Sequence, residues 1–441
     1  MTASTSKWIL LPDYLVENLD APFCLTTHGQ FSRRELLAHA LYISELLPEQ
    51  HYAINLCQDR YLFMVAFLAV LLRGQISLLP PNQTPLIIEE LLANYSHSYV
   101  LSDEAFNDHY GQIRLAMQEL RLSERAFPAL DVNRPISISF TSGSTGEPKA
   151  IFKTLSEFQR GSELALAQLD LLDKHLTLVS TVPPQHMYGL ETSFFWPLFS
   201  GLTLHNCRPF YPEDVHRSLE EVQGGAILVA TPIHLKALIR SETNWPAVAK
   251  ILSSTAPMAQ ALAIAVENKL HAPLFELFGS TETQSFASRR TAFTEVWQNY
   301  EGITLQEQVG QFWVQGGHLN QAIMLDDCFE LKAEQGFRIL GRSTDLIKIA
   351  GKRASLAELN LRLNAIDGVD DGVFFEMQSE RLSVVVVSQL SKEVIIGQLR
   401  KSIDPVFIPR QVMRVMHLPR NALGKIDKTA LDVLIRERDL G

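Results

Sequence analysis

Cysteines are few in this sequence and are not clustered. Cys24, Cys57, Cys207 and Cys328 are scattered over 441 residues without a Cys-x-x-Cys pair. Structural zinc sites use closely spaced cysteine pairs and disulfide scaffolds are short and rich in cysteine, so four scattered cysteines argue against both. Scattered thiols are typical of a reducing compartment, and we expect a cytoplasmic protein.

Long apolar runs and an excess of positive charge are also missing. The longest apolar run, Tyr61–Leu72, is too short for a membrane span, which takes about 20 residues. The start of the chain lacks the basic and apolar segments of a signal peptide. A net charge of −10 excludes a general attraction to nucleic acid or to anionic membranes. We therefore expect neither of them as a partner.

Short β-rich segments alternate with helical patterns from about residue 50 onward. Residues 135–140, 176–181 and 226–231 are typical of strands, and residues 156–172 place apolar side chains at helical spacing. This alternation predicts an α/β fold with largely parallel sheets and crossover helices.

The last hundred residues have a different character. A polar, glycine-punctuated stretch precedes a short α/β segment, and Ser355 and Glu358 have the spacing of a capping box at a helix start. We expect a large amino-terminal domain of layered sheets and helices over residues 1–341. A small, mobile α+β domain would follow over residues 342–441, with a hinge near residues 343–345.

One stretch has the composition of a phosphate-binding loop. Residues 140–150, FTSGSTGEPKA, combine four small hydroxyl residues with two glycines and lie between a predicted strand and a predicted helix. Backbone N–H groups and hydroxyls can converge on an anion in such a turn. A Walker A loop requires Gly-Lys-Ser/Thr, whereas Lys149 follows Pro148 and precedes Ala150. The alternative for an isolated loop is a flexible surface turn.

Four more segments follow this loop in a fixed order. They are PPQHMYGL at 183–190, FGSTET at 278–283, an aspartate fourteen residues before a Gly-Arg pair within 326–353, and LPRNALGKID at 418–427. Together with the loop they resemble the adenylate-forming superfamily of acyl- and aryl-CoA ligases, peptide-synthetase adenylation domains and luciferases. The resemblance covers roughly residues 135–430.

The resemblance implies an acid–thiol ligase that uses ATP and Mg²⁺. In this family a small carboxylic acid attacks the α-phosphate, pyrophosphate leaves, and the acyl-adenylate passes its acyl group to a thiol. The implied acceptor is a phosphopantetheine thiol, on a separate acyl carrier protein or on CoA. Cations and oriented donors are needed because two anions must meet.

The loop is implied to grip the leaving pyrophosphate. The residues that would hold the β- and γ-phosphates are Thr141, Ser142, Gly143, Ser144, Thr145 and Gly146. Lys149 would steady the loop or the leaving group, and a solvated surface lysine is the alternative.

The segment 278–283 is implied to contact the nucleotide. Phe278 stands where the family usually has tyrosine, and its ring would stack on adenine beside Gly279. Thr281 would contact the α-phosphate. Glu282 would bind Mg²⁺, which prefers oxygen ligands and phosphate co-ligands.

Three segments are implied to line the acyl pocket. Thr255 and Ala256, within SSTAP at 253–257, resemble a segment that borders both adenine and acyl group. His186 resembles a residue that gates the acyl pocket, and a histidine that caps a turn is the alternative. Residues 231–234 would complete the lining.

An acidic and a basic residue are implied to contact the ribose. Asp327 has the spacing of the family's ribose-binding aspartate, with Asp326 as the alternative because the usual Thr-Gly before it is absent. Arg342 matches a second ribose or phosphate contact.

Lys425 matches the lysine that bridges the substrate carboxylate and the α-phosphate, a role that suits a point charge on a flexible stem. Family members rotate the small domain between the two half-reactions and exchange this lysine for a loop that here contains Lys348. The hinge residue is Thr344 or Asp345, where the family usually has Asp or Lys directly after the Gly-Arg-x segment.

The resemblance does not specify which carboxylic acid is activated or which thiol accepts the acyl group. The compact build resembles stand-alone ligases that load aryl or acyl groups onto carrier proteins in aryl-polyene pathways. Residues 401–441 contain eight basic against five acidic residues, which suits an acidic carrier protein and also the phosphates of CoA. We expect an aryl acid such as a hydroxybenzoate and a carrier protein. The rivals are a CoA ligase and a catalytically degenerate nucleotide-binding protein.

Overall fold

The structure is a computed structural model. It describes residues 8–9, 18–27, 29–104, 111–142, 148–333, 336–342, 346–349, 352–377, 381–421 and 424–439. None of the helices in these ranges combines the length and the apolar character that a membrane span requires.

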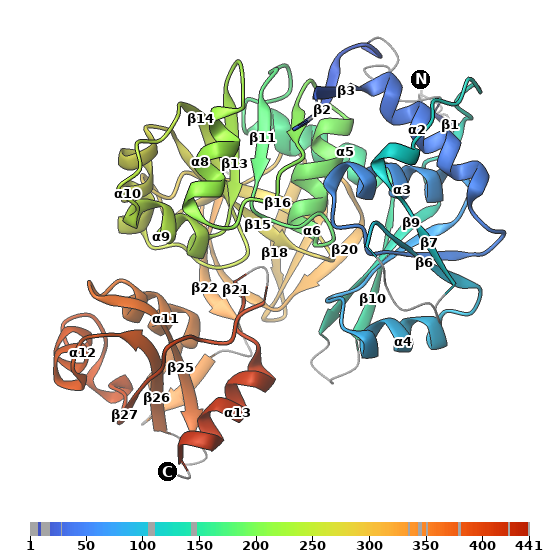
Figure 1. Cartoon of the computed structure of the whole chain (residues 1–441). Coiled ribbons are helices and arrows are strands. Elements are labelled where there is room, and N and C mark those ends of the chain that lie inside the picture. Colours follow the sequence, from blue (N-terminus) through green and yellow to red (C-terminus); the bar gives the residue numbers. More distant parts are fainter. Residues whose placement is uncertain are drawn as a thin grey trace.

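Eleven strands of the described chain form the largest sheet, which lies at the centre of the molecule (Figure 1). Its order is β21-β22-β17-β16-β15-β14-β13-β11-β12-β2-β3. The run from β2 through β15 is parallel, and the flanking strands β3, β16, β17, β22 and β21 pair antiparallel. The strands are β2 Pro22–Thr26, β3 Gly29–Ser32, β11 Thr177–Ser180, β12 Thr203–His205, β13 Ala226–Ala230, β14 Val248–Ser253, β15 Leu274–Ser280, β16 Gln284–Arg289, β17 Trp297–Asn299, β21 Asp327–Leu331 and β22 Gly336–Arg342.

A second sheet packs beside the first, in the order β10-β9-β5-β4-β6-β7. Its strands are β4 Tyr52–Asn55, β5 Ile76–Leu79, β6 Ser98–Ser102, β7 Gln112–Arg114, β9 Pro135–Ser142 and β10 Pro148–Thr154. A third sheet consists of β18 Ile303–Gln308, β19 Gln311–Gly316 and β20 Leu319–Leu325. The short strands β1 Trp8–Ile9 and β8 Leu130–Asp131 pair with each other.

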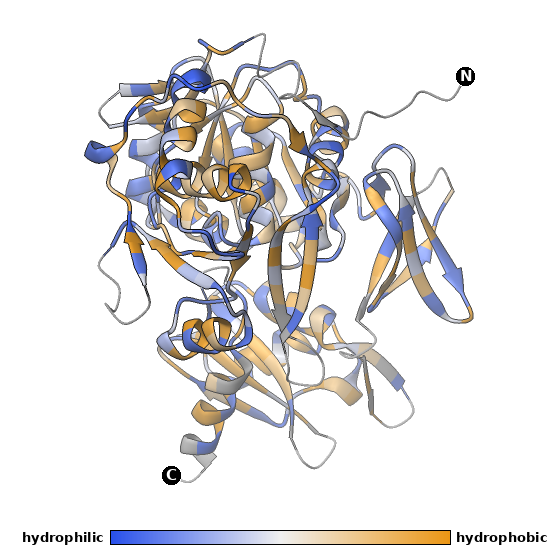
Figure 2. Cartoon of the chain, turned by 90° about the vertical axis from the view of Figure 1, so that its right-hand side faces the viewer, coloured by the Kyte–Doolittle hydropathy of each residue, from blue (hydrophilic) through white to orange (hydrophobic). Residues whose placement is uncertain are grey.

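Helices cover the sheets and close the main core. The apolar run in α3 is buried throughout, which confirms the expectation of a buried helix. One hydrophobic cluster joins this helix to both large sheets, and Figure 2 shows hydrophobic residues gathered on these inner elements. The helices of this part are α2 Arg33–Leu46, α3 Arg60–Leu72, α4 Pro85–Asn94, α5 Leu155–Gln168, α6 Met187–Leu190, α7 Trp196–Leu198, α8 Pro212–Glu220, α9 Pro232–Arg240 and α10 Gln260–Leu270, with the 3-10 turn η2 Met117–Glu119 and the π-helix η3 Glu191–Phe195.

The carboxyl-terminal part lies below the large sheet, beside α9 and β22 (Figure 1). It contains β23 Leu346–Ile349, β24 Lys352–Ser355, α11 Leu356–Asn364, β25 Val369–Met377, β26 Arg381–Ser388, α12 Lys392–Leu399, η5 Pro405–Phe407, β27 Gln411–Arg414 and α13 Lys428–Asp439. Among the described residues, no hydrophobic cluster joins side chains from both sides of residue 342. The α/β class and the layered sheets are confirmed.

Two local predictions were wrong. The phosphate loop does not lead directly into a helix, because β9 and β10 form an antiparallel hairpin and α5 starts only at Leu155. Thr154 and Glu157 build a capping box there, so the helix N-terminus is satisfied within its own first turn. Ser355 does precede α11, but its hydroxyl is buried without a hydrogen bond and makes no capping box with Glu358.

Candidate active site

The carboxyl ends of the parallel strands bring most of the described candidates to one edge of the large sheet. Strands β11, β13, β14 and β15 run in the same direction. Thr181, Thr231 and Thr255 follow the first three, and the turn with Thr281 and Glu282 follows the fourth. In open α/β sheets ligands bind outside the carboxyl ends of the strands. This edge is therefore the candidate site.

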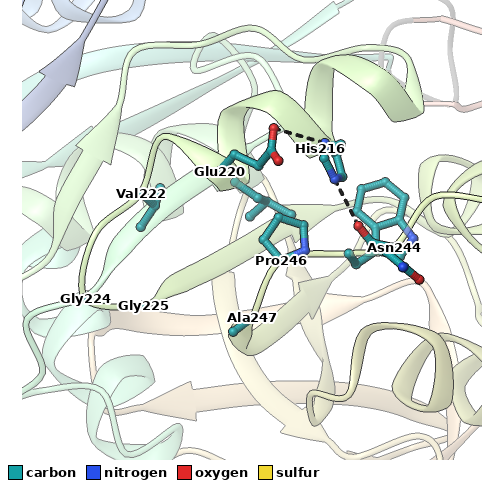
Figure 3. A pocket seen from close by; sticks show the side chains of 10 residues that line it. His216, Glu220, Val222, Gly224, Gly225, Asn244, Pro246 and Ala247 are labelled. Carbon is teal, nitrogen blue, oxygen red and sulfur yellow. Dashed lines mark hydrogen bonds and ion pairs between the residues drawn. The ribbon is translucent and has the colours of Figure 1, made fainter.

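A surface pocket lies at the opposite end of the same strands. Figure 3 shows His216 and Glu220 of α8 facing Asn244, and residues 224–225 and 246–247 that precede β13 and β14. The His216 imidazole lies 3.3 Å from the Glu220 carboxylate and 2.9 Å from the carbonyl oxygen of Asn244. None of the predicted site residues lines this pocket.

Two backbone features mark the candidate edge. Thr255 has a φ of 82°, in the left-handed region that a β-branched residue adopts at a cost on the order of 1–3 kcal/mol. A Cβ on Gly279 would lie 1.8 Å from the carbonyl oxygen of Gln284, so only glycine allows the two strands to approach here. Thr255 is half-buried and its neighbour Ala256 is exposed.

Phe278 rests on a cluster of aromatic rings. Its ring centroid lies 5.3 Å from Phe286, 5.4 Å from Trp297, and 5.8 Å from both Phe329 and Phe337. The ring is half-buried. The four neighbours hold it at the end of β15, where stacking on adenine stays a prediction.

Asp327 and Arg342 are brought together by strand pairing. They are register partners on β21 and β22, and Cys328 pairs with Gly341 next to them. Asp327 is half-buried, whereas Asp326 is exposed. The spacing that pointed to a shared ribose contact therefore corresponds to two cross-strand neighbours.

The structure also places Lys425 near His186. Burial, and after it the positive charge of Lys425, lower the pKa of the His186 imidazole to about 4. The imidazole is thus neutral at pH 7, and the exposed Lys425 supplies the charge. His186 stands at the N-cap position of α6, but its side chain makes no capping hydrogen bond, which disfavours the turn-capping alternative.

His234 connects the residues that follow β11 and β13 at the candidate edge. Its Nδ1 lies 2.8 Å from the Thr181 hydroxyl and 3.1 Å from the Thr231 hydroxyl. Burial lowers the pKa of His234 to about 4. The ring also contacts exposed Phe210, with centroids 5.9 Å apart.

The small part of the chain docks on helix α9. Arg240 forms a 2.6 Å ion pair with Asp370, and Lys236 donates to the carbonyl oxygens of Asn364 and Val369 at 3.3 and 3.0 Å. A Cβ on Gly424 would come within 2.7 Å of Ile233. These contacts hold the turn with Lys425 against the carboxyl end of β13.

Some predicted residues lie outside this description. Gly143, Ser144, Thr145 and Gly146 and the hinge candidates Thr344 and Asp345 are outside the described residues, as are the side chains of Thr141, Ser142, Arg342 and Lys348. Lys149 is described. It pairs in register with Thr141, and its side chain is exposed.

The donor set at the edge fits a nucleotide-bound Mg²⁺ better than an independent metal centre. Glu282 supplies one half-buried carboxylate, and Mg²⁺ in phosphate sites uses one or two carboxylates together with substrate oxygens. Within the described ranges, no group of three or more His, Cys, Asp or Glu residues could hold a metal ion by itself.

Comparison with known proteins decides the family. The profile of the family described as "AMP-binding enzyme" matches residues 26–310. The chain belongs to this family. This AMP-binding enzyme is 24% identical over 432 residues to a 2-succinylbenzoate–CoA ligase of Listeria innocua, covering 90% of this chain and 91% of that protein.

Two solved structures share the fold of this AMP-binding enzyme. The o-succinylbenzoate CoA synthetase of Bacillus subtilis, in complex with ATP and magnesium, matches with a TM-score of 0.81 at 19% identity, over 96% of this chain and 99% of that one. An anthranilate CoA ligase bound to anthranoyl-AMP matches with a TM-score of 0.83 at 14% identity over both full chains. The adenylate-forming resemblance and the class of AMP-forming acid–thiol ligases are confirmed.

Sequence reasoning missed the buried polar groups behind the Glu282 turn. Lys153, Glu191 and His318 are buried and contact this turn from three different elements. One signal was available, because Lys153 follows three apolar residues and Glu191 is a charged residue in a segment rich in apolar and aromatic residues.

Proposed function

We propose that this enzyme activates an aryl carboxylic acid as its adenylate and transfers the acyl group to a phosphopantetheine thiol. The observation that carries the proposal is the position of Lys425. It lies at the same edge of the large sheet as the turn with Glu282. A cation from the small part of the chain then lies near His186 and Thr231, which are implied to border the acyl group.

The first role of Lys425 would be to neutralise negative charge. Its ammonium would neutralise both the attacking carboxylate and the α-phosphate, so the two anions can approach. Neutral His186 beside it adds no competing cation and can border the acyl group. Glu282 would hold Mg²⁺ with the phosphate oxygens, and this ion would neutralise charge on the leaving pyrophosphate.

Asp327 and Arg342 would orient the ribose. As cross-strand neighbours, they can present an acceptor and a donor to the same sugar. The implied phosphate grip of residues 141–146 belongs to the proposal as well. Holding two reactants in attack geometry supplies a large part of the rate enhancement in such a reaction.

The proposal includes two domains, residues 1–341 and 342–441, with a hinge near residues 343–345. Support comes from the separate hydrophobic clusters on the two sides and from the polar character of the contacts on α9. A polar interface of this kind can open and close at low cost.

The acid is proposed to be aryl because two similar proteins are named for aryl acids, 2-succinylbenzoate and anthranilate. Their names also favour CoA as the acceptor. The carrier-protein alternative rests on the basic carboxyl-terminal segment, and one of its charges, Arg420, is already paired with Asp371 at 2.6 Å.

Carboxylate-dependent exchange of pyrophosphate into ATP tests the first half-reaction. Hydroxybenzoates, cinnamates, 2-succinylbenzoate and fatty acids are screened with Mg²⁺, and we expect exchange with an aryl acid. Thioester formation is then compared with free CoA and with a phosphopantetheinylated carrier protein. ATP binding without exchange for any acid would instead favour the degenerate nucleotide-binding protein.

A further inference from the structure

The turn that carries Thr281 and Glu282 is held from behind at three backbone positions. The buried Lys153 ammonium donates to the carbonyl oxygen of Glu282 at 2.6 Å. The His318 Nε2 donates to the carbonyl oxygen of Thr283 at 2.7 Å. The Glu191 carboxylate accepts from the Ser285 N–H at 2.9 Å and from its hydroxyl at 2.7 Å.

These three side chains come from distant parts of the chain. Lys153 is on β10, Glu191 is in the π-helix η3, and His318 precedes β20. π-Helical turns are rare and often occur at functional sites. The three groups converge only in the folded protein.

Lys153 is the only ammonium among these three groups and is almost fully buried, with 2% of its side chain exposed. Its charge is balanced by Glu157, whose carboxylate lies 3.1 Å away. An unpaired buried ammonium costs several kcal/mol, so this pairing makes the position possible. The ammonium is thereby available to fix the Glu282 carbonyl oxygen.

Helix α5 leaves room for this arrangement. It carries Glu157 and Gly161 and packs against β16. A Cβ on Gly161 would lie 2.5 Å from the side-chain oxygen of Gln284, the residue that ends the turn with a φ of 55°. The missing side chain of Gly161 therefore admits Gln284 behind the turn.

We propose that Lys153 is a positioning residue for Glu282. Paired with Glu157, it fixes the peptide group of Glu282 and so sets the direction in which the carboxylate faces the Mg²⁺-bound nucleotide. Lys153 does not touch substrate, and its effect passes through Glu282. This inference rests on the proposed function for the role of Glu282.

Lys153→Met tests the proposal, because methionine keeps the apolar length and removes the charged donor. We expect the dissociation constant of ATP with Mg²⁺, measured by calorimetry, to rise about tenfold, as on losing an outer partner of a metal ligand. Binding of ATP in the presence of EDTA should change less than twofold. A role confined to stability would move neither value in the folded variant.

Lys250→Met is the matched control. Lys250 is another partly buried lysine that donates to a carbonyl oxygen, that of Leu169, and it lies near the start of β14, away from the turn. We expect a lower Tm and unchanged Mg²⁺-dependent ATP binding. An equal loss of binding in Lys250→Met would overturn the proposal.

A double variant guards against misfolding. Lys153→Met/Glu157→Gln removes both charges of the buried pair, so neither is left without its partner, and glutamine can preserve the capping box with Thr154. The same tenfold loss supports the proposal, and wild-type Mg²⁺ dependence in the folded double variant contradicts it. Because binding is the readout, an absence of pyrophosphate exchange in the wild type would refute the proposed function without deciding this inference.

Discussion

Lys425 lies close enough to His186 for its charge to lower the pKa of the imidazole, although 239 positions separate the two residues in the sequence. The turn that presents Lys425 is fixed by short contacts. Gly424 has a φ of 75° and leaves no room for a Cβ beside Ile233 on α9, and the Asn421 side chain accepts from the Lys425 N–H at 3.0 Å. The position of this cation is thus built into the contact between the two parts of the chain.

Gly424→Ala should impair adenylation. The added Cβ would lie 2.7 Å from Ile233 Cγ2 and would occupy the left-handed region, so the Lys425 turn must shift. We expect about a tenfold lower exchange rate, since a displacement of 1 Å can cost up to a hundredfold.

The matched control for this variant is Gly397→Ala. Gly397 lies inside α12, and a Cβ there meets nothing within 4 Å. It should raise the free energy of unfolding by about 0.5–1 kcal/mol and leave exchange unchanged. Wild-type exchange in Gly424→Ala would show that the position of the turn does not matter.

Asp327→Asn should raise the KM for ATP about tenfold, because the carboxylate that we propose accepts from both ribose hydroxyls is replaced by an amide with one acceptor. Asp326→Asn is the control, since Asp326 is exposed and is not in register with Arg342. Steady-state exchange kinetics measure both variants. The reverse ranking of the two KM values would transfer the ribose role to Asp326.

The Arg240–Asp370 ion pair should favour the conformation in which Lys425 reaches the site. Both side chains are about half exposed, so the pair contributes about 0.2–1 kcal/mol. Asp370→Arg should slow exchange a few-fold without slowing transfer from preformed adenylate. Restoration by the charge swap Arg240→Asp/Asp370→Arg identifies the pair as the cause, and no change in either half-reaction would rule it out.

Glu191 should make stability depend on pH. Burial raises the pKa of Glu191 to about 7, against the opposing hydrogen bonds of Ser285 and the charge of Lys153. The folded state therefore binds a proton more tightly than the unfolded state, whose glutamate has a pKa of about 4.3. This contribution to stability is complete below pH 4 and is lost as the pH rises through 7.

Glu191→Gln removes this contribution to the pH dependence of stability, and its side-chain oxygen can still accept a hydrogen bond from Ser285. Denaturant titrations at pH 5 and pH 8 should show that the variant loses less stability than the wild type, by about 3 kcal/mol at most. Neighbouring Tyr188 and Tyr300 stay neutral in this range because burial raises their pKa values. Equal slopes in both proteins would place the Glu191 pKa near its ordinary value.

The fold could be predicted where local patterns decide it. The apolar run of α3, the strand β13 and the helix start at Ser355 follow from composition and spacing. The hairpin of β9 and β10 was not predicted, because the loop was expected to lead directly into a helix, although the Thr154–Glu157 capping box marks the later start. Strand order across the large sheet is set by tertiary packing, which no local pattern reports.

The candidate site could be predicted only in its exposed half. Residues such as Glu282 and Lys425 stand in recognisable motifs, whereas the groups behind the turn do not. Lys153 and His318 are 165 positions apart, and the side chain of each donates to a backbone carbonyl oxygen of the turn. Every residue has a backbone carbonyl, so the identity of the residue in the turn does not indicate such a contact. These contacts can therefore be found only in the three-dimensional structure.

The central claim is that Lys425 supplies the positive charge that adenylation requires. Measuring adenylation and thiol transfer separately in Lys425→Ala tests this claim most directly. We expect at least a hundredfold loss of acid-dependent pyrophosphate exchange, since removing one strong transition-state contact costs about 10²–10³. Thioester formation from chemically prepared acyl-adenylate should stay within a few-fold of wild type, and exposed Lys401→Ala should change neither half-reaction. Wild-type exchange in Lys425→Ala would contradict the account.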